Sequence, residues 1–396
     1  MATAIASRSQ APVGLIHLSL AVGGFAIGTT EFATMSLLPD MARDLNVDAP
    51  TAGHLISAYA LGVVVGAPLL AVVGARMARR TLLIVLMGLF AVGNALSAAA
   101  PGYGAMMAFR FLSGLPHGAY FGIATLVAAS LVDQGRRTRA AARVLLGLTV
   151  ATIVGVPAAN ALGQLIGWRS CFVIVAARAA LTATLVALFA PRDAADPQAS
   201  PLRELTALKR RQVWLTLAVG AIGFGGLFAV YTYLADTMLA VTKVPQATVP
   251  LALAVFGVGM TAGNLIVPRF ADRALLPSAA GVLVWSAVAL ALWPVAAGHL
   301  WSVLVAMLLI GLGGSLGTVL QTRLMDVAGE AQALAAALNH SAFNTANALG
   351  PWLGGLAIAA GYGWTSTGWV GAALALAGLA VLAVSWLVDR ADRRRR

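Results

Sequence analysis

Long apolar stretches follow one another along almost the whole chain, and they constrain its fold more than any other feature. A helix rises about 1.5 Å per residue and lipid offers the backbone no hydrogen-bond partners, so about 20 apolar residues in helical form span the hydrocarbon layer. Hydrophobic residues make up 60% of the 396 residues and charged residues only 10%. We therefore predict an all-α membrane protein with transmembrane helices at 13–37, 51–74, 82–101, 103–132, 141–164, 170–190, 213–240, 248–271, 276–297, 300–322, 332–359 and 364–388.

The 26 Lys and Arg residues give the chain a net charge of +12 and are distributed unevenly among the predicted loops. Almost all fall on the side of the two termini, and the exceptions on the other side are Arg43, Arg169 and Lys243. Because Lys and Arg collect in cytoplasmic loops, we expect a multi-pass protein of a bacterial inner membrane with both termini cytoplasmic. The basic end, residues 393–396, is interpreted as a topological anchor near anionic lipid rather than as a nucleic-acid site.

The cysteine and histidine content of the chain argues against an internal disulfide and against a metal site. Cys171 is the single cysteine, so an internal disulfide cannot form. His and Cys never cluster with metal-ligand spacing, and no metal site is expected.

One polar break, residues 191–212, divides the chain into two parts of similar length. We predict an N-terminal six-helix half (1–190), a cytoplasmic linker (191–212) and a C-terminal six-helix half with a basic tail (213–396). An offset of 197 residues aligns the two halves, placing Tyr59, Gly62, Gly66, Arg76 and Gly114 on Phe256, Gly259, Gly263, Arg273 and Gly311. Two related six-helix halves are a known transporter plan, with the substrate site between them near the midplane.

Several short motifs occur in a consistent order along these stretches. They are Thr30-Glu31-Phe32 in the first stretch, the basic loop with Arg76, Arg79 and Arg80 after the second, Arg110 to Gly114 in the fourth, Gly155-Val156-Pro157 in the fifth, Asp272-Arg273 after the eighth, and Asn344, Asn347 and Gly350 in the eleventh. Together they resemble the twelve-helix drug/proton antiporter branch of the major facilitator superfamily. In pattern the chain is similar to arabinose-efflux-permease-like and chloramphenicol-resistance proteins.

The resemblance implies roles for some of these residues. In that family the basic loop latches the outward-open state, and the arginine of the fourth helix is tied to proton coupling. The resemblance therefore marks a candidate conformational switch made of Arg76, Arg79, Arg80, Gly155, Pro157, Asp272 and Arg273. The alternative for the three loop arginines is that they only set the topology.

Glu31 is the only acidic residue well inside an apolar stretch. A charge near the bilayer centre costs roughly 2.5–3.5 kcal/mol on insertion scales, so such groups tend to face a cavity and serve function. We interpret Glu31 as a proton-binding group, and a structural salt bridge is the alternative. Arg110 lies at a similar depth and can pair with it. His117, seven residues along the same helix face, is a third candidate for proton coupling because imidazole titrates in the physiological range.

Other polar side chains inside the later stretches are candidates for lining a substrate cavity. They are Tyr231, Tyr233, Asp236, Gln321, His340, Asn344 and Asn347. Interhelical hydrogen bonding is the alternative explanation for the Asn and Gln residues. Arg178, in the middle of the sixth stretch, has no partner visible in the sequence.

No nucleotide-binding loop is present, because neither Lys209 nor Lys243 follows the glycine pattern that such a loop requires. We therefore expect no cofactor and no enzymatic activity, and we infer that an ion gradient supplies the energy. The predicted function is proton-coupled export of a small molecule, a drug or a sugar-like metabolite, by a monomer that works by alternating access. Two alternatives stay open: proton-coupled uptake of a metabolite, and a non-transporting membrane sensor or lipid-handling protein.

Overall fold

The structure is a computed structural model that describes residues 11–74, 76–133, 137–192, 208–328 and 332–394. All regular structure within these residues is helical, and no strand occurs among them. Ten helical spans in the described chain are long and apolar enough to cross a membrane, and α15 (Leu275–Ala291) is a shorter apolar helix. The 26-residue α19 (Gln332–Ala357) matches the predicted eleventh helix. The predicted all-α membrane fold is confirmed.

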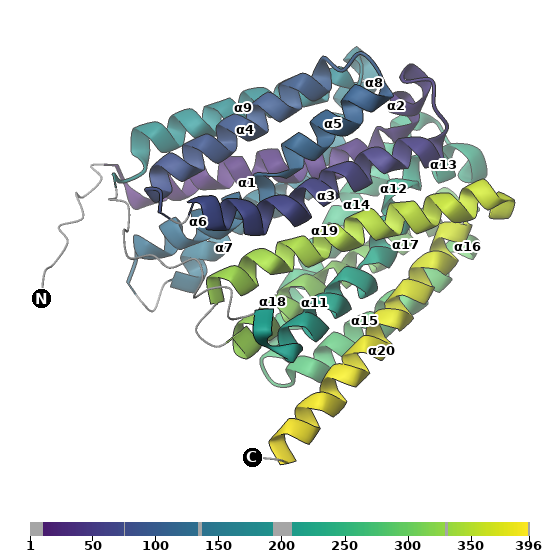
Figure 1. Ribbon diagram of the computed structural model, residues 1–396. Coiled ribbons are helices and arrows are strands. Elements are labelled where there is room, and N and C mark those ends of the chain that lie inside the picture. Colours follow the sequence, from purple (N-terminus) through teal and green to yellow (C-terminus); the bar gives the residue numbers. More distant parts are fainter. Residues whose placement is uncertain (1–10, 75, 134–136, 193–207, 329–331, 395–396) are drawn as a thin grey trace, which may run out of the picture.

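The helices before the linker form one side of the molecule, coloured from purple through blue to teal in Figure 1. They are α1 (Val13–Ser36), α2 (Leu38–Asp44), α3 (Ala49–Gly74), α4 (Arg79–Ala98), α5 (Tyr103–Gly114), α6 (His117–Ser130), α7 (Arg137–Val150), the π-helical segment η2 (Ala151–Gly155), α8 (Val156–Ile166) and α9 (Arg169–Phe189).

The helices after the linker form the other side, coloured teal to yellow in Figure 1. They are α11 (Arg211–Gly223), α12 (Gly225–Thr232), α13 (Leu234–Thr237), η4 (Met238–Thr242), η5 (Gln246–Thr248), α14 (Val249–Ala271), α15, α16 (Trp293–Ala296), α17 (Leu300–Leu312), η6 (Gly313–Ser315), α18 (Leu316–Ala328), α19, η7 (Ile358–Tyr362) and α20 (Ser366–Arg394). The two sides meet where α3 packs along α19. Residues 193–207 of the predicted linker lie outside the described chain, so the boundaries of the two halves stay a prediction.

Several of the predicted single helices are interrupted, among them the fourth and the seventh. The span expected at 103–132 consists of α5 and α6, which are separated at Leu115 and Pro116. Proline has no backbone N–H to donate to the preceding turn, and this explains the break. The span expected at 213–240 is divided into α11, α12 and α13 by breaks at Phe224 and Tyr233, and it ends in the π-helical η4. Apolar content alone predicts the membrane crossing but not these interruptions.

The offset of 197 residues holds for contacts as well as for sequence. A Cβ atom on Gly62 of α3 would lie 2.2 Å from the carbonyl oxygen of Phe111, and one on Gly259 of α14 would lie 2.3 Å from that of Leu308. The residue numbers of the glycine and of its partner both differ by 197 between the two pairs. The same relation links Gly66 and Leu115 (2.0 Å) to Gly263 and Leu312 (2.4 Å). Glycine lets helices approach closely in lipid, and the two sides use it at equivalent places.

Candidate functional site

Glu31 lies where the two sides of the molecule meet. Its side chain is on α1 and only 7% of the residue is exposed. The Asn347 side-chain nitrogen, on α19, donates a hydrogen bond of 3.2 Å to Glu31 Oε1. Asn347 is fully buried, and its Oδ1 has no hydrogen-bond partner among the described residues. The single acidic residue predicted for proton coupling therefore contacts a residue predicted for the substrate cavity.

The Arg110 guanidinium contacts residues of three neighbouring helices. Its guanidinium carbon lies 4.3 Å from the ring centre of Tyr59 on α3 and 5.5 Å from that of Phe172 on α9. Its Nη1 donates a hydrogen bond of 3.5 Å to Thr30 Oγ1, and Thr30 donates one of 2.9 Å to Asn94 Oδ1. Arg110 is fully buried, and its Nε and Nη2 have no partner in the described part of the chain.

Arg110 and Glu31 do not form an ion pair in this conformation, although Thr30, which Arg110 contacts, is next to Glu31 in the chain. Tyr59, Thr30 and Asn94 were not among the predicted site residues. Their roles depend on how each helix is rotated about its axis, which the sequence does not show.

His117 and His340 form a second contact across the two sides. Tyr59 Oη and His117 Nδ1 are 2.9 Å apart. The His117 ring centre lies 5.9 Å from that of His340, which stacks on Phe121 with ring centres 5.3 Å apart. This cluster therefore joins α3, α6 and α19 through aromatic and imidazole rings.

Tyr231 and Tyr233, both predicted for the cavity, have different surroundings. Tyr231 is buried on α12 among aromatic rings, with Phe256 at 4.5 Å and Phe32 at 5.5 Å between ring centres. Tyr233 Oη donates a hydrogen bond of 3.0 Å to the Pro351 carbonyl. Tyr231 thus contacts α1 from the other side of the molecule. The Tyr233 hydroxyl bonds its own side but also faces α3, because a Cβ atom on Gly53 would lie 2.4 Å from it.

The remaining predicted cavity residues are not brought into one cluster. Asn344 donates to the His340 carbonyl of its own helix at 2.9 Å. Asp236 on α13 and Gln321 on α18 are half-buried, and each carries a buried oxygen without a hydrogen-bond partner among the described residues. Arg178 lies over the Phe25 ring, with 4.8 Å from its guanidinium carbon to the ring centre.

The candidate switch residues lie at several places in the fold. Arg80 donates a hydrogen bond to the Ala187 carbonyl on α9. Arg76, Arg79, Asp272 and Arg273 are exposed. Gly155 ends the π-helical η2, and a Cβ atom there would lie 2.6 Å from Thr29 Oγ1 on α1. Pro157 follows in the first turn of α8, which continues η2 without a break.

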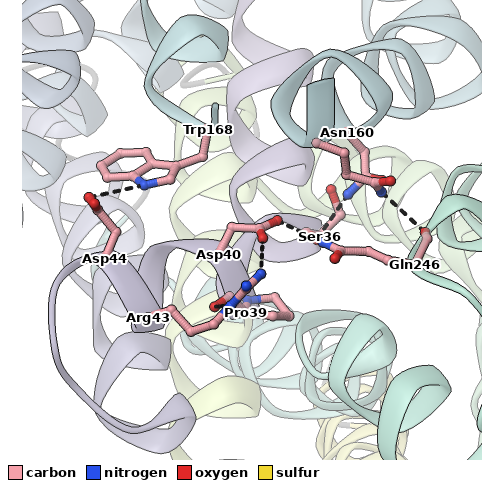
Figure 2. Close-up of polar contacts among 9 residues, drawn as sticks. Ser36, Pro39, Asp40, Arg43, Asp44, Asn160, Trp168 and Gln246 are labelled. Carbon is pink, nitrogen blue, oxygen red and sulfur yellow. Dashed lines mark hydrogen bonds and ion pairs between the residues drawn. The ribbon is translucent and has the colours of Figure 1, made fainter. Parts of the chain in front are cut away.

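Polar contacts join the two sides at the end of the molecule where α1 terminates (Figure 2). Gln246 of η5 donates a hydrogen bond of 2.9 Å to Asp40 Oδ2 on α2. The Gln164 side chain of α8 donates to the Gln246 carbonyl at 3.2 Å and to Asn160 Oδ1 at 2.7 Å. Asn160 in turn donates to the Ser36 carbonyl at 2.9 Å. We call this group, Asp40, Asn160, Gln164 and Gln246, the Ser36-end clasp.

The position of these contacts defines the conformation. Hydrogen bonds between described residues of the two sides occur at the Ser36-end clasp, at Glu31 and Asn347, and between Ser57 and the Ala348 carbonyl at 3.0 Å. All of them lie near Glu31 or closer to the Ser36 end. The structure is therefore a state closed at that end.

One cavity of about 660 Å³ lies away from this site, at the other end of α1. Its lining includes Val13, Ser130, Asp133 and Arg143. The connection from α6 to α7 beside it includes residues 134–136, which lie outside the described chain, so the cavity is not assigned to the site. Among the described residues, no group of three or more His, Cys, Asp or Glu side chains could hold a metal ion.

A many-span helical bundle with a buried carboxyl, guanidinium and amides where its two sides meet is the architecture of a membrane transport protein. The profile of the Major Facilitator Superfamily matches residues 20–281 and 234–396. The chain is 40% identical over 369 residues to the inner membrane transport protein YdhP of Escherichia coli, covering 93% of this chain and 94% of that protein. The chain therefore belongs to the Major Facilitator Superfamily.

Two further similarities agree with this assignment. The chain is 35% identical over 342 residues to a chloramphenicol resistance protein of Streptomyces lividans, covering 84% of this chain and 86% of that protein. Its fold is similar to a crystal structure of a variant of the nucleoside transporter NupG, with a TM-score of 0.70, 15% sequence identity, and coverage of 93% and 99% of the two chains. The protein is thus a multi-pass inner membrane transporter and not an enzyme.

Proposed function

We propose that this transporter is a proton-coupled antiporter that exports a small molecule by alternating access, and that Glu31 carries the coupling proton. Glu31 is a buried carboxyl group at the contact between α1 and α19, and this position supports the proposal. A carboxyl group inside the hydrocarbon region is costly and is retained where it serves transport. At this contact its charge can affect how the two sides meet.

We further propose that both termini are cytoplasmic, because the basic residues gather in the loops on that side. In this orientation the Ser36 end faces the outside. The conformation described above is then one that is closed towards the outside. Charge placement also supports a role for the basic loop with Arg76, Arg79 and Arg80, either as the conformational latch or as a topological anchor.

In the proposed cycle, Glu31 takes up a proton when the molecule is open to the outside. The protonated protein closes at the Ser36 end, releases the proton inwards, and binds substrate from the cytoplasm or the inner leaflet. Arg110 favours the ionised form of Glu31 by its charge, because an opposite charge nearby stabilises a carboxylate. His117 is the second candidate for handling the proton, since it lies beside Tyr59 at the same contact.

For the substrate we propose a small amphipathic compound. Tyr231, Phe32 and Phe256 provide a group of packed aromatic rings. At separate places in the fold, Asn344, Gln321 and Asp236 each carry an acceptor oxygen without a partner among the described residues. The chloramphenicol resistance protein among its relatives supports export of such a compound. Uptake of a metabolite is the second candidate, because direction depends on gradients and relative affinities.

The proposal is tested in inverted membrane vesicles with an imposed pH gradient, acid inside. A panel of amphipathic compounds is added, and the gradient and compound accumulation are followed together. We expect at least one compound to accumulate and to dissipate the gradient only when the protein is present. A sensor or lipid-handling protein would bind a compound without accumulation, and that result would refute the proposal.

A further inference from the structure

The Asn347 amide presents two different hydrogen-bonding groups at the Glu31 carboxyl. Its nitrogen donates to Glu31 Oε1, while its own oxygen is buried and has no partner among the described residues. A side-chain amide and a carboxyl group both carry two polar atoms at similar spacing. Two hydrogen bonds can therefore join Asn347 and Glu31. The bond from the Asn347 nitrogen is in place, and the Asn347 oxygen, which would accept the second bond, has no partner among the described residues.

The chemistry of the pair depends on the proton. A protonated carboxyl is a donor as well as an acceptor, so its O–H can bind the Asn347 oxygen while its carbonyl accepts from the amide nitrogen. An ionised carboxylate only accepts, so it leaves the amide oxygen unpaired in a buried place. Leaving a buried acceptor unpaired costs about 1–3 kcal/mol. The arrangement therefore fits the protonated acid better than the carboxylate.

The charged and titratable groups around Glu31 differ in which side of the molecule they belong to. Arg110 contacts Thr30, the residue before Glu31, and lies over the Tyr59 ring, and Arg110 and Tyr59 belong to α5 and α3, on the same side as Glu31 itself. His117, bound to Tyr59, also lies on that side. Asn347 lies on α19, on the other side. When the two sides rock apart, the first three groups stay with Glu31, whereas the bond to Asn347 changes.

We propose that Asn347 is the positioning residue that couples protonation of Glu31 to closure at the Ser36 end. This inference rests on the proposed function, in which Glu31 carries the proton. Protonation of Glu31 completes the acid–amide pair and stabilises the state closed at the Ser36 end. Deprotonation removes one of the two hydrogen bonds and leaves the buried Asn347 oxygen unpaired. By linkage, closure in turn favours proton uptake.

The experiment measures the distance between the two sides at the Ser36 end by double electron–electron resonance. Spin labels are placed at Gly102→Cys and Gly298→Cys in a Cys171→Ala background. A Cβ atom at Gly102 meets no atom within 4 Å, and one at Gly298 meets only the Val295 carbonyl at 3.9 Å, so both positions accept a label. Purified full-length protein in lipid nanodiscs is measured at pH 5.5 and pH 8.5.

In the parent protein we expect the ratio of short to long distances to be about tenfold higher at the lower pH, the effect of one charge-linked hydrogen bond. Asn347→Leu and Asn347→Ala both remove the amide, and they leave side chains of different volume. Both variants should reduce the pH effect to less than about twofold. Asn264→Leu is the matched control, because Asn264 accepts a bond from Thr318 within its own side at 2.9 Å. It should keep the full pH effect.

Glu31→Gln separates this inference from the proposed function. The Gln side chain can form an amide–amide pair with Asn347 and cannot titrate, so the short distance should dominate at both pH values. If Glu31→Gln loses the pH effect while both Asn347 variants keep it, the proton site stands and the role of Asn347 is refuted. If Glu31→Gln itself keeps the pH effect, the proposed proton site fails.

Discussion

The side-chain amide of Gln246 donates a hydrogen bond of 2.9 Å to the carboxylate of Asp40, which also forms an ion pair with Arg43. Gln246 begins η5 in the second half of the chain, and Asp40 lies on the short helix α2 in the first. The bond therefore crosses from one side of the molecule to the other at the Ser36 end. It is a contact that must break whenever that end opens.

We predict that Gln246→Leu weakens closure at the Ser36 end. The loss of one hydrogen bond, about 1 kcal/mol, should change the ratio of closed to open molecules about fivefold. The spin-label pair at Gly102 and Gly298 reports this ratio. Thr248→Ala is the matched control, because the Thr248 hydroxyl bonds only the nearby Pro245 carbonyl at 2.7 Å. Equal distance distributions in Gln246→Leu and the unmodified protein would show that the bond between Gln246 and Asp40 does not contribute to closure.

Gly62→Ala and Gly259→Ala should destabilise the protein to a similar extent. Each new methyl group would lie 2.2 or 2.3 Å from a carbonyl oxygen of the neighbouring helix, so the helices must separate, at a cost of about 1–3 kcal/mol. Thermal unfolding in detergent measures the effect. Gly88→Ala and Gly281→Ala are controls inside α4 and α15 with no atom within 4 Å, and they should be neutral or slightly stabilising. A destabilised control with an unaffected Gly62 variant would contradict the packing argument.

Arg110→Ala should reduce proton-driven export at least tenfold, because it removes the buried cation that lies over Tyr59 and contacts Thr30. Arg110→Lys should restore it only in part, since an ammonium group lacks the planar guanidinium that stacks on a ring and forms several directed bonds. Initial export rates in vesicles measure both variants. Arg178→Lys is the control, because Arg178 also lies over an aromatic ring but outside the site, and its rate should stay within about twofold.

Asp48 provides a test of helix capping outside the spans. Its carboxylate accepts a hydrogen bond of 2.8 Å from the Thr51 backbone N–H at the start of α3, and bonds from Thr51 lower the Asp48 pKa below its usual value. A lowered pKa means that this contribution to stability is present above the unfolded-state pKa, about 3.9, and is lost as the pH falls through the folded-state value. Asp48→Asn should flatten that part of the acid dependence of thermal stability. If the acid dependence of thermal stability is unchanged in Asp48→Asn, other carboxylates are responsible for it.

Apolar stretches were sufficient to predict the membrane fold, because the length and composition of each crossing are written locally in the chain. The Glu31 and Arg110 positions were also accessible, since a charge inside an apolar stretch stands out. The breaks at Pro116, Phe224 and Tyr233 were not predicted, because a stretch remains apolar whether or not its helix is continuous.

The partners of the site residues could not be predicted from the sequence. Asn347 and Asn344 are three residues apart on α19, yet one contacts Glu31 and the other bonds its own helix. Which of them faces α1 depends on the rotation of α19, and tertiary packing sets that rotation. The Gln246 contact joins segments 206 residues apart, and neither residue has any local signal.

Glu31→Gln tests whether Glu31 carries the coupling proton. The measurement is compound accumulation in inverted vesicles under an imposed pH gradient, together with compound binding to purified protein without a gradient. We predict that the variant binds the compound with unchanged affinity but loses gradient-driven accumulation, because the amide keeps the hydrogen-bonding shape and cannot titrate. Accumulation by Glu31→Gln that is equal to that of the unmodified protein and still depends on the gradient would contradict the assignment of the proton to Glu31.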